Sequence, residues 1–465
     1  DLALSPDGRH VAVLCHKKIV VIDAETGDAV QEVAYATTHG GGSFTGICYA
    51  PDGKRLYASC IRGAVEEFEV GANGRLTARE PMPLKGRRGN NALPAGMAIT
   101  PDGARLYVAL NFNNTLGEID LKERKLVREI PVGNAPYDVV LVAQPGAEQP
   151  TIAVVSNWGG RLPAGNEPTG PSGSAARVKV DPVRNIASEG SVSIVDLAQK
   201  RVTSEIVVGQ HASGLAVGPD GVVYVANANA DTVSVVDAVN ARLVETISTR
   251  PAEIPLFGSA PNALVEHGGR LYVSNGTNNA VAVVRLADRS SGKNAADSSS
   301  ELLGQIPTGW YPAGIAFDAK RKTLYVANIK GIGSRATNWQ GKRKIKDEKV
   351  FGYNSHDYSG TVSIIPLPSE AGLAAHTKTV LANNRMTETI SALSPPRDNV
   401  KPRPVPQRHG EPSVFKHVVY IIKENRTYDQ VFGDMPQGEG DKSLCIFGRE
   451  VTPNHHALVE QFVLF

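Results

Sequence analysis

The chain has 465 residues, with 49 basic and 47 acidic side chains and a formal net charge of +2. This balance argues against nucleic acid as a partner, and no apolar run approaches the roughly 20 residues of a membrane span. The length allows two or three domains, and 46 glycines and 30 prolines favour a turn-rich β body. Because the chain begins at Asp1 and ends in an apolar run, we interpret it as an internal piece of a longer protein.

A unit of four predicted strands repeats along residues 1–384; it is clearest in residues 94–132 and returns in residues 212–247. In most units the first strand ends in Pro-Asp-Gly, a turn in which Pro fixes φ and Gly accepts a positive φ. Such first-to-second-strand turns fall at Pro6–Gly8, Pro51–Gly53, Pro101–Gly103, Pro145–Gly146, Pro219–Gly221, Gly268–Gly269 and Asp318–Lys320. A single unit would expose an apolar face, so the units must stack around an axis. We predict an all-β, seven-bladed β-propeller.

Two insertions, Arg161–Gly190 and Lys330–Gly360, separate the second and third strands of the fourth and seventh units. Since strands alternate in direction, both insertions should rise from one face of the ring. Its basic residues include Lys85, Arg87, Arg88, Lys342, Arg343, Lys344 and Lys346. This face could dock the next domain or an anionic substrate, or it could consist of solvated loops. His376–Ala382 is expected to supply the outermost strand of the seventh unit and so to close the ring.

Three second strands end in a shared motif: Tyr224–Asn227 and Tyr325–Asn328 read Tyr-Val-Ala-Asn, and Tyr272–Asn275 reads Tyr-Val-Ser-Asn. On these residues the region 1–384 resembles the YVTN-type seven-bladed β-propeller family. The resemblance implies the fold far more than a function. Asparagines recur after the second strand, at Asn111, Asn157, Asn227, Asn275 and Asn328. We favour a structural role in the turn over a ring of ligand-binding side chains.

A charged, proline-rich linker is expected over residues 385–413, and a new segment begins after it. The apolar run Val418–Ile422 has the pattern of a buried parallel strand. Ligands are held at the carboxyl ends of such strands. The pattern therefore predicts that Glu424 and Asn425 lie where chemistry would occur.

The stretch Lys416–Asp434, with its core Glu-Asn-Arg-Thr-Tyr-Asp, resembles the opening of a phosphoesterase family. That family includes bacterial phospholipases C and acid phosphatases and belongs to the alkaline phosphatase superfamily. The resemblance implies that residues 414–465 begin a truncated α/β domain that hydrolyses phosphate esters with divalent metal ions. It also implies that Glu424 and Asn425 are metal ligands and that the parent protein is periplasmic or secreted. The family's Ser or Thr nucleophile is expected beyond Phe465, so we expect no catalytic residue within this chain.

Three further residues are weaker candidates for substrate binding. Arg426 could pair with a phosphate or simply anchor its loop. His455 and His456 follow a predicted helix start at Thr452, and neighbouring residues on a helix point about 100° apart. We favour capping and packing roles for this pair, with one of the two close to substrate as the other possibility.

Two kinds of function therefore compete. In the first, the chain is part of a propeller fused to a metal-dependent phosphoesterase. In the alternative, the propeller is a ligand- or protein-binding module, or a surface-layer-type repeat protein, without catalysis. The Glu-Asn-Arg-Thr-Tyr-Asp stretch favours the first, and the seven repeats are compatible with both.

Overall fold

The computed structural model describes residues 1–36, 41–87, 91–144, 146–172, 176–251, 258–289, 299–332, 343–345, 348–350, 359–438 and 440–464. The chain divides into two compact units. One comprises residues 1–331 with 360–384, and the other comprises residues 332–359 with 385–465.

The first unit contains seven antiparallel sheets of three or more strands, called blades 1–7 in chain order. Blades 1 and 2 contain β1 (Leu2–Leu4), β2 (His10–Leu14), β3 (Lys18–Asp23) and β4 (Ala29–Ala34), then β5 (Gly42–Tyr49), β6 (Arg55–Cys60), β7 (Ala64–Val70), β8 (Leu76–Ala78) and β9 (Met82–Pro83). Blades 3 and 4 contain β10 (Pro94–Ile99), β11 (Arg105–Leu110), β12 (Thr115–Asp120) and β13 (Lys125–Pro131), then β14 (Pro136–Val142), β15 (Ile152–Asn157), β18 (Gly190–Asp196) and β19 (Arg201–Val208).

Blades 5 and 6 contain β20 (Ala212–Val217), β21 (Val222–Asn227), β22 (Thr232–Asp237) and β23 (Arg242–Ser248), then β24 (Pro261–His267), β25 (Arg270–Asn275), β26 (Ala280–Arg285) and β27 (Glu301–Pro307). Blade 7 contains β28 (Trp310–Asp318), β29 (Thr323–Gly331) and β32 (Thr361–Pro366). The shorter elements are the hairpin β16 (Thr169–Ser172) and β17 (Ala176–Lys179), and the 3-10 turns η1 (Pro219–Gly221) and η2 (Gly276–Asn278).

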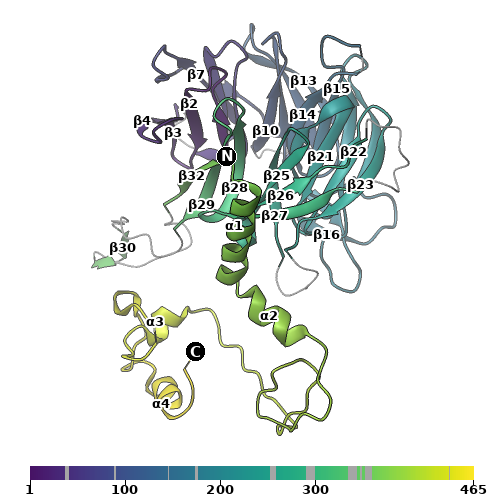
Figure 1. The fold of residues 1–465 in the computed structure, drawn as a ribbon. Helices are drawn as coiled ribbons and strands as arrows, with labels where there is room; N and C mark the ends of the chain where they lie inside the picture. Colours follow the sequence, from purple (N-terminus) through teal and green to yellow (C-terminus); the bar gives the residue numbers. More distant parts are fainter. Residues whose placement is uncertain are drawn as a thin grey trace. The chain divides into compact units, whose positions relative to one another are not determined.

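The first strands of the blades form a closed ring around a central channel. Figure 1 shows the sheets of this unit following one another from purple to green. Each of these strands contacts the first strand of the next blade, and β28 of blade 7 contacts β1 of blade 1. Residues from six of the first strands line the channel, together with Asp1 just before β1, and its volume is about 210 Å³. The predicted seven-bladed β-propeller is confirmed.

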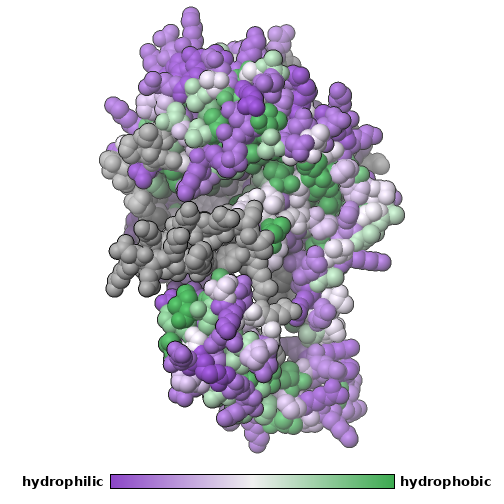
Figure 2. Space-filling model, turned by 90° about the vertical axis from the view of Figure 1, so that its left-hand side faces the viewer, coloured by the Kyte–Doolittle hydropathy of each residue, from purple (hydrophilic) through white to green (hydrophobic). Residues whose placement is uncertain are grey.

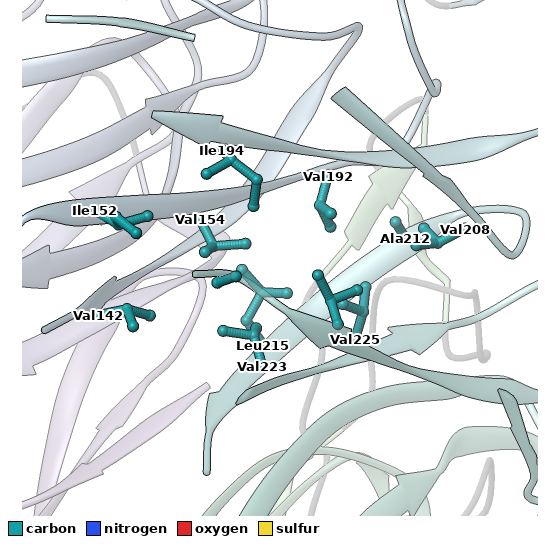
Figure 3. Close-up of a cluster of buried hydrophobic side chains, with 12 residues drawn as sticks. Val142, Ile152, Val154, Val192, Ile194, Val208, Ala212, Leu215, Val223 and Val225 are labelled. Atoms are coloured by element: carbon teal, nitrogen blue, oxygen red, sulfur yellow. The ribbon is translucent and has the colours of Figure 1, made fainter. Parts of the chain in front are cut away.

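Apolar side chains are buried at every interface between neighbouring blades. Successive side chains of a strand point to opposite faces, so the nearly continuous apolar runs of these strands give each sheet two apolar faces. Figure 3 shows one such cluster, in which Val154 and Ile194 of blade 4 pack near Leu215 and Val225 of blade 5. An equivalent cluster joins blades 7 and 1. The surface seen in Figure 2 is mostly hydrophilic, with small hydrophobic patches between polar side chains.

The Pro-Asp-Gly turns form where they were predicted. In the turn of blade 3, the Asp102 carboxylate accepts hydrogen bonds from the Thr100 hydroxyl at 2.6 Å and the Ala104 amide at 2.9 Å. Gly103 follows with φ +70°, a conformation that costs a glycine little. These local bonds explain how the repeat fixes the hairpin between the first two strands.

The predicted outer strand at His376–Ala382 is wrong, because these residues lie within helix α1 (Glu370–Asn383). Ser369 caps the helix by accepting a hydrogen bond from the Gly372 amide, and the alanine-rich sequence that follows favours a helix. Leu373 and Val380 are buried on one side of α1, and the Thr377 hydroxyl accepts a hydrogen bond from the Gln305 amide of β27. Blade 7 thus has three strands in the described residues, and the contact between β28 and β1 closes the ring.

The second unit contains the hairpin β30 (Arg343–Ile345) and β31 (Glu348–Val350), and the helical elements α2 (Met386–Leu393), α3 (Tyr428–Phe432), η3 (Lys442–Leu444) and α4 (Pro453–Gln461). The strand predicted at Val418–Ile422 is not formed. Its side chains are 73–85% exposed, and no described strand pairs with it. A lone strand has no ladder of hydrogen bonds to hold it, so the apolar run alone does not fold. The alkaline phosphatase-like α/β segment is therefore not confirmed.

Candidate functional site

Three of the five recurring asparagines link neighbouring strands of their own blade, whereas Asn111 donates to the Pro136 carbonyl of the next blade and Asn275 to the Thr249 carbonyl. Asn227, buried at the end of β21, donates from Nδ2 to the Thr232 hydroxyl at 3.0 Å and the Ser234 hydroxyl at 2.9 Å. Asn157 and Asn328 make matching bonds to hydroxyls on the third strands of their blades, β18 and β32. These bonds support the structural interpretation over a ligand ring, but they are cross-strand links rather than the turn preference that we predicted.

Four aromatic rings stack in a row on the face that carries the loops entering the first strands. Phe44 of β5 stacks on Tyr137 of β14 with ring centroids 5.1 Å apart, and Tyr137 stacks on Trp158 at 5.5 Å. Trp158 stacks in turn on His211, just before β20, at 4.4 Å and 15° between the ring planes. We call these four residues the aromatic strip. It joins blades 2, 4 and 5, and Phe44 and Tyr137 also line the channel.

The electrostatics of the aromatic strip keep it uncharged near neutral pH. Burial lowers the pKa of His211, so its imidazole is neutral, and burial together with the nearby Asp138 raises the pKa of Tyr137. Phe44, at one end of the row, is 45% exposed. An uncharged aromatic row with an exposed end suits contact with apolar or aromatic groups more than recognition of an ion.

The same face carries further exposed apolar side chains in blade 7. Trp310 begins β28 and is exposed, as is Ile329 towards the end of β29. The Lys330 ammonium lies 5.8 Å from the centre of the neighbouring Tyr311 ring. Aromatic and basic side chains thus occur together on this face, a composition that is common in protein interfaces.

Asp138 is an acidic side chain in the channel wall. Its carboxylate accepts hydrogen bonds from the Val139 amide at 2.8 Å and, across the blade boundary, from the Leu215 amide at 3.0 Å. Burial raises its pKa to about 6, although both hydrogen bonds act in the opposite direction. Asp138 therefore links blades 4 and 5 and can change charge near neutral pH.

Sequence reasoning missed the aromatic strip, although the repeat itself contains a signal for part of it. Other blades read Pro94-Ala95-Gly96 and Pro312-Ala313-Gly314 where blade 4 reads Pro136-Tyr137-Asp138. A large ring and a carboxylate thus replace small residues at positions that face the channel. A search for departures from the repeat, rather than for its shared residues, would have found Tyr137 and Asp138.

The basic residues predicted on this face are only partly described. Arg87 pairs with Glu129 at 3.1 Å, and Lys85 is exposed. Arg88, Lys342 and Lys346 lie outside the described residues, and only the backbone is described for Arg343 and Lys344. A docking role for these basic residues stays a prediction.

The predicted metal ligands lie in the second unit, and both Glu424 and Asn425 are exposed. Among the residues that the structure describes, no group of three or more His, Cys, Asp or Glu side chains could hold a metal ion. The described residues around Glu424 and Asn425 thus do not fit a metal site, and divalent-metal binding there stays a prediction. Arg426 lies over the Phe447 ring, with its guanidinium carbon 4.9 Å from the ring centre. This contact favours the loop-anchoring alternative for Arg426.

The two histidines have different surroundings. His456 is fully buried on α4, where Nε2 lies 2.8 Å from the Asp434 carboxylate and Nδ1 lies 2.9 Å from the Thr452 carbonyl oxygen. A hydrogen bond from the Arg449 amide, together with His456, lowers the pKa of Asp434 to about 2. His455 is half-buried and lies 2.6 Å from the Lys423 ammonium. These contacts support packing for His456, and substrate binding by either histidine stays a prediction.

Comparisons with known proteins bear on the fold alone. No family model matches the chain, and no curated protein matches it in sequence. The chain is similar to Kuenenia stuttgartiensis hydrazine synthase, with a TM-score of 0.51 and 19% identity over 70% of this chain and 91% of the other. It is also similar to the WD40 repeats of RRP9, with a TM-score of 0.54 and 12% identity over 79% and 93% of the two chains. At these identities the similarity supports the propeller, but neither the YVTN family nor a fused phosphoesterase.

No described helix has the length and apolar character needed to cross a bilayer. The predicted periplasmic or secreted location stays a prediction.

Proposed function

We propose that the chain is a binding module that holds a protein or peptide partner on the propeller face carrying the aromatic strip. The observation that carries this proposal is the row of four stacked rings, from Phe44 to His211, with Phe44 exposed at its end. Aromatic anchors supply much of the binding energy in protein interfaces. The rings also lose little conformational freedom on binding, because their mutual stacking already orders them.

The partner would place an apolar or aromatic side chain against Phe44 and the mouth of the channel. Trp310 of blade 7 provides a second exposed aromatic contact on the same face. The Tyr311 ring and the Lys330 ammonium beside it add a polar rim. An apolar centre with a polar rim is the usual anatomy of such a surface.

A peptide library selected on the whole chain tests this function. We expect enriched peptides to lose affinity by about tenfold or more on Phe44→Ala and on Trp310→Ala. Leu243→Ala is the matched control. Leu243 is as exposed as Phe44, at 44% against 45%, but it lies on the outer strand β23, away from the aromatic strip. The proposal fails if the selected peptides bind both face variants as tightly as the unchanged chain.

Hydrolysis of phosphate esters is the second candidate, and the resemblance of Lys416–Asp434 to phosphoesterases is the observation that favours it. The described residues offer two exposed oxygen donors there, Glu424 and Asn425. A titration with Mn²⁺ tests the first requirement of this candidate. Saturable Mn²⁺ binding that Glu424→Ala abolishes would favour this candidate. Mn²⁺ binding with the same affinity in Glu424→Ala would count against it.

A further inference from the structure

A second pocket lies on the opposite face of the propeller, between blades 1 and 2. It has a volume of about 420 Å³. The first-to-second-strand turns of the two blades line it, together with the turn between β7 and β8. The lining residues with ionisable side chains are Asp7, Arg9, His10, Tyr49, Asp52 and Lys54. Pockets of this size are large enough for small metabolites.

Tyr49 is the residue in this pocket that lacks a partner. It ends β5 and is only 7% exposed, yet its hydroxyl is buried without a hydrogen bond to any described residue. Two other buried tyrosines of the propeller are paired: the hydroxyls of Tyr35 and Tyr325 each donate to a backbone carbonyl, of Cys15 and Ala24, at 2.6 Å. A buried hydroxyl without a partner lowers the stability of the fold. A ligand that accepts a hydrogen bond from Tyr49 would remove this cost, and no described residue does so.

The acidic neighbour of Tyr49 is already occupied. The Asp7 carboxylate accepts hydrogen bonds from the Ser5 hydroxyl at 2.6 Å, the Arg9 amide at 3.0 Å and Arg9 Nε at 2.7 Å. Burial, with a smaller effect from the Asp7 charge, raises the pKa of Tyr49. The phenol therefore stays protonated and is available as a donor.

Two charged side chains of the pocket lining have no ion pair among the described residues, the Lys54 ammonium and the Asp52 carboxylate. Arg9 is paired with Asp7, whereas the Lys54 ammonium has no ion pair or hydrogen bond among the described residues. Asp52 accepts a hydrogen bond from the Lys54 backbone amide. With two carboxylates in the lining, a doubly charged anion would be repelled, but a singly charged one can be held by Lys54 and Tyr49.

We propose that this pocket binds a small organic monocarboxylate, which accepts hydrogen bonds from the Tyr49 hydroxyl and the Lys54 ammonium. Charge-assisted hydrogen bonds of this kind are stronger than neutral ones. The site is separate from the aromatic strip, so it would add a small-molecule input to a module that binds its partner on the other face.

The test is an NMR titration of the whole chain with sodium propionate, in a buffer free of other carboxylates and of phosphate. We expect saturable propionate binding that Tyr49→Phe and Lys54→Gln each weaken by about tenfold or more. Propionamide, which has the same shape without the charge, should not compete. Inorganic phosphate should bind less tightly than propionate. Tyr325→Phe is the control for loss of a tyrosine hydroxyl outside the pocket and should leave propionate affinity unchanged.

Three results would overturn the proposal: no saturable propionate binding, affinity that is unchanged in Tyr49→Phe, or tighter binding of phosphate. Thermal unfolding without ligand gives an independent check. Tyr49→Phe should keep or raise the melting temperature, because it removes an unpaired buried hydroxyl, whereas Tyr325→Phe should lower it. A clear loss of stability in Tyr49→Phe would show that the protein itself already satisfies the hydroxyl, and would also overturn the proposal.

Discussion

Two apolar runs of similar composition differ in structure: one forms a buried strand, and the other is exposed and forms none. Val222–Ala226 of β21 is almost fully buried between neighbouring strands and blades, whereas each side chain of Val418–Ile422 is at least 73% exposed. Both runs have the pattern of a strand. The first has antiparallel partners on both sides, and the second has none among the described residues. The comparison teaches that an apolar run becomes a strand only where the chain also provides its neighbours.

The largest expected effect comes from placing a charge in each run. Val225→Asp would bury an unpaired carboxylate in the core between blades 4 and 5, and should cost about 4 kcal/mol or more of unfolding free energy. Val419→Asp should change that free energy by less than about 0.5 kcal/mol, because its side chain is already exposed. Chemical denaturation of both variants measures the difference. Equal losses of stability would mean that Val418–Ile422 is a buried strand after all.

The pH dependence of stability should sharpen the comparison through Asp138. Its raised pKa of about 6, against an ordinary value of 3.8, means that the folded state holds this proton more tightly than the unfolded state. The resulting stabilisation is complete below pH 3.8, is lost as the pH rises through about 6, and amounts to about 3 kcal/mol. Denaturant unfolding across this range should show the fall, and Asp138→Asn should abolish it. A parallel fall in Asp138→Asn would assign the effect to other groups.

Asp434 in the second unit should respond to pH with the opposite sign. Its pKa is lowered to about 2, so its contribution is present above the ordinary value of 3.8 and is lost as the pH falls through about 2. Asp434→Asn should speed amide exchange in α4 at neutral pH, since His456 loses its carboxylate partner. The propeller should keep its melting temperature in this variant. Unchanged exchange in α4 would show that the pair does not stabilise the helix.

Two asparagines give a smaller, matched contrast. Asn227→Ala should cost about 2 kcal/mol, because it leaves the hydroxyls of Thr232 and Ser234 without their shared donor inside blade 5. Asn425→Ala should leave stability unchanged, because Asn425 is exposed. Melting temperatures compare the two. A neutral Asn227→Ala would remove the cross-strand role that we assign to the recurring asparagine.

The smallest expected signal is catalytic. With added divalent metal, we expect the chain not to hydrolyse a chromogenic phosphodiester, because the resemblance to phosphoesterases implies a Ser or Thr nucleophile beyond Phe465. Robust turnover that Glu424→Ala removes would contradict this expectation and favour the phosphoesterase candidate over the binding module.

The fold could be predicted because the signal repeats. Four Pro-Asp-Gly turns and three related turns each mark a hairpin, and these seven short-range signals define the ring without long-range information. The error at His376–Ala382 has a local cause: Ser369 and the alanines that follow favour a capped helix, and β27 provides the surface for its buried side. The aromatic strip could not be derived from spacing alone, because its residues are far apart in the sequence. Phe44, Trp158 and His211 join one row only when their blades are packed around the channel.

Hydrogen–deuterium exchange of the whole chain, with and without a selected peptide, tests the central claim most directly. The account predicts protection in residues 42–47, 136–139, 158–160 and 209–213, the segments that contain or adjoin the aromatic strip. Protection confined to the outer strands of the blades or to residues 414–464 would contradict it.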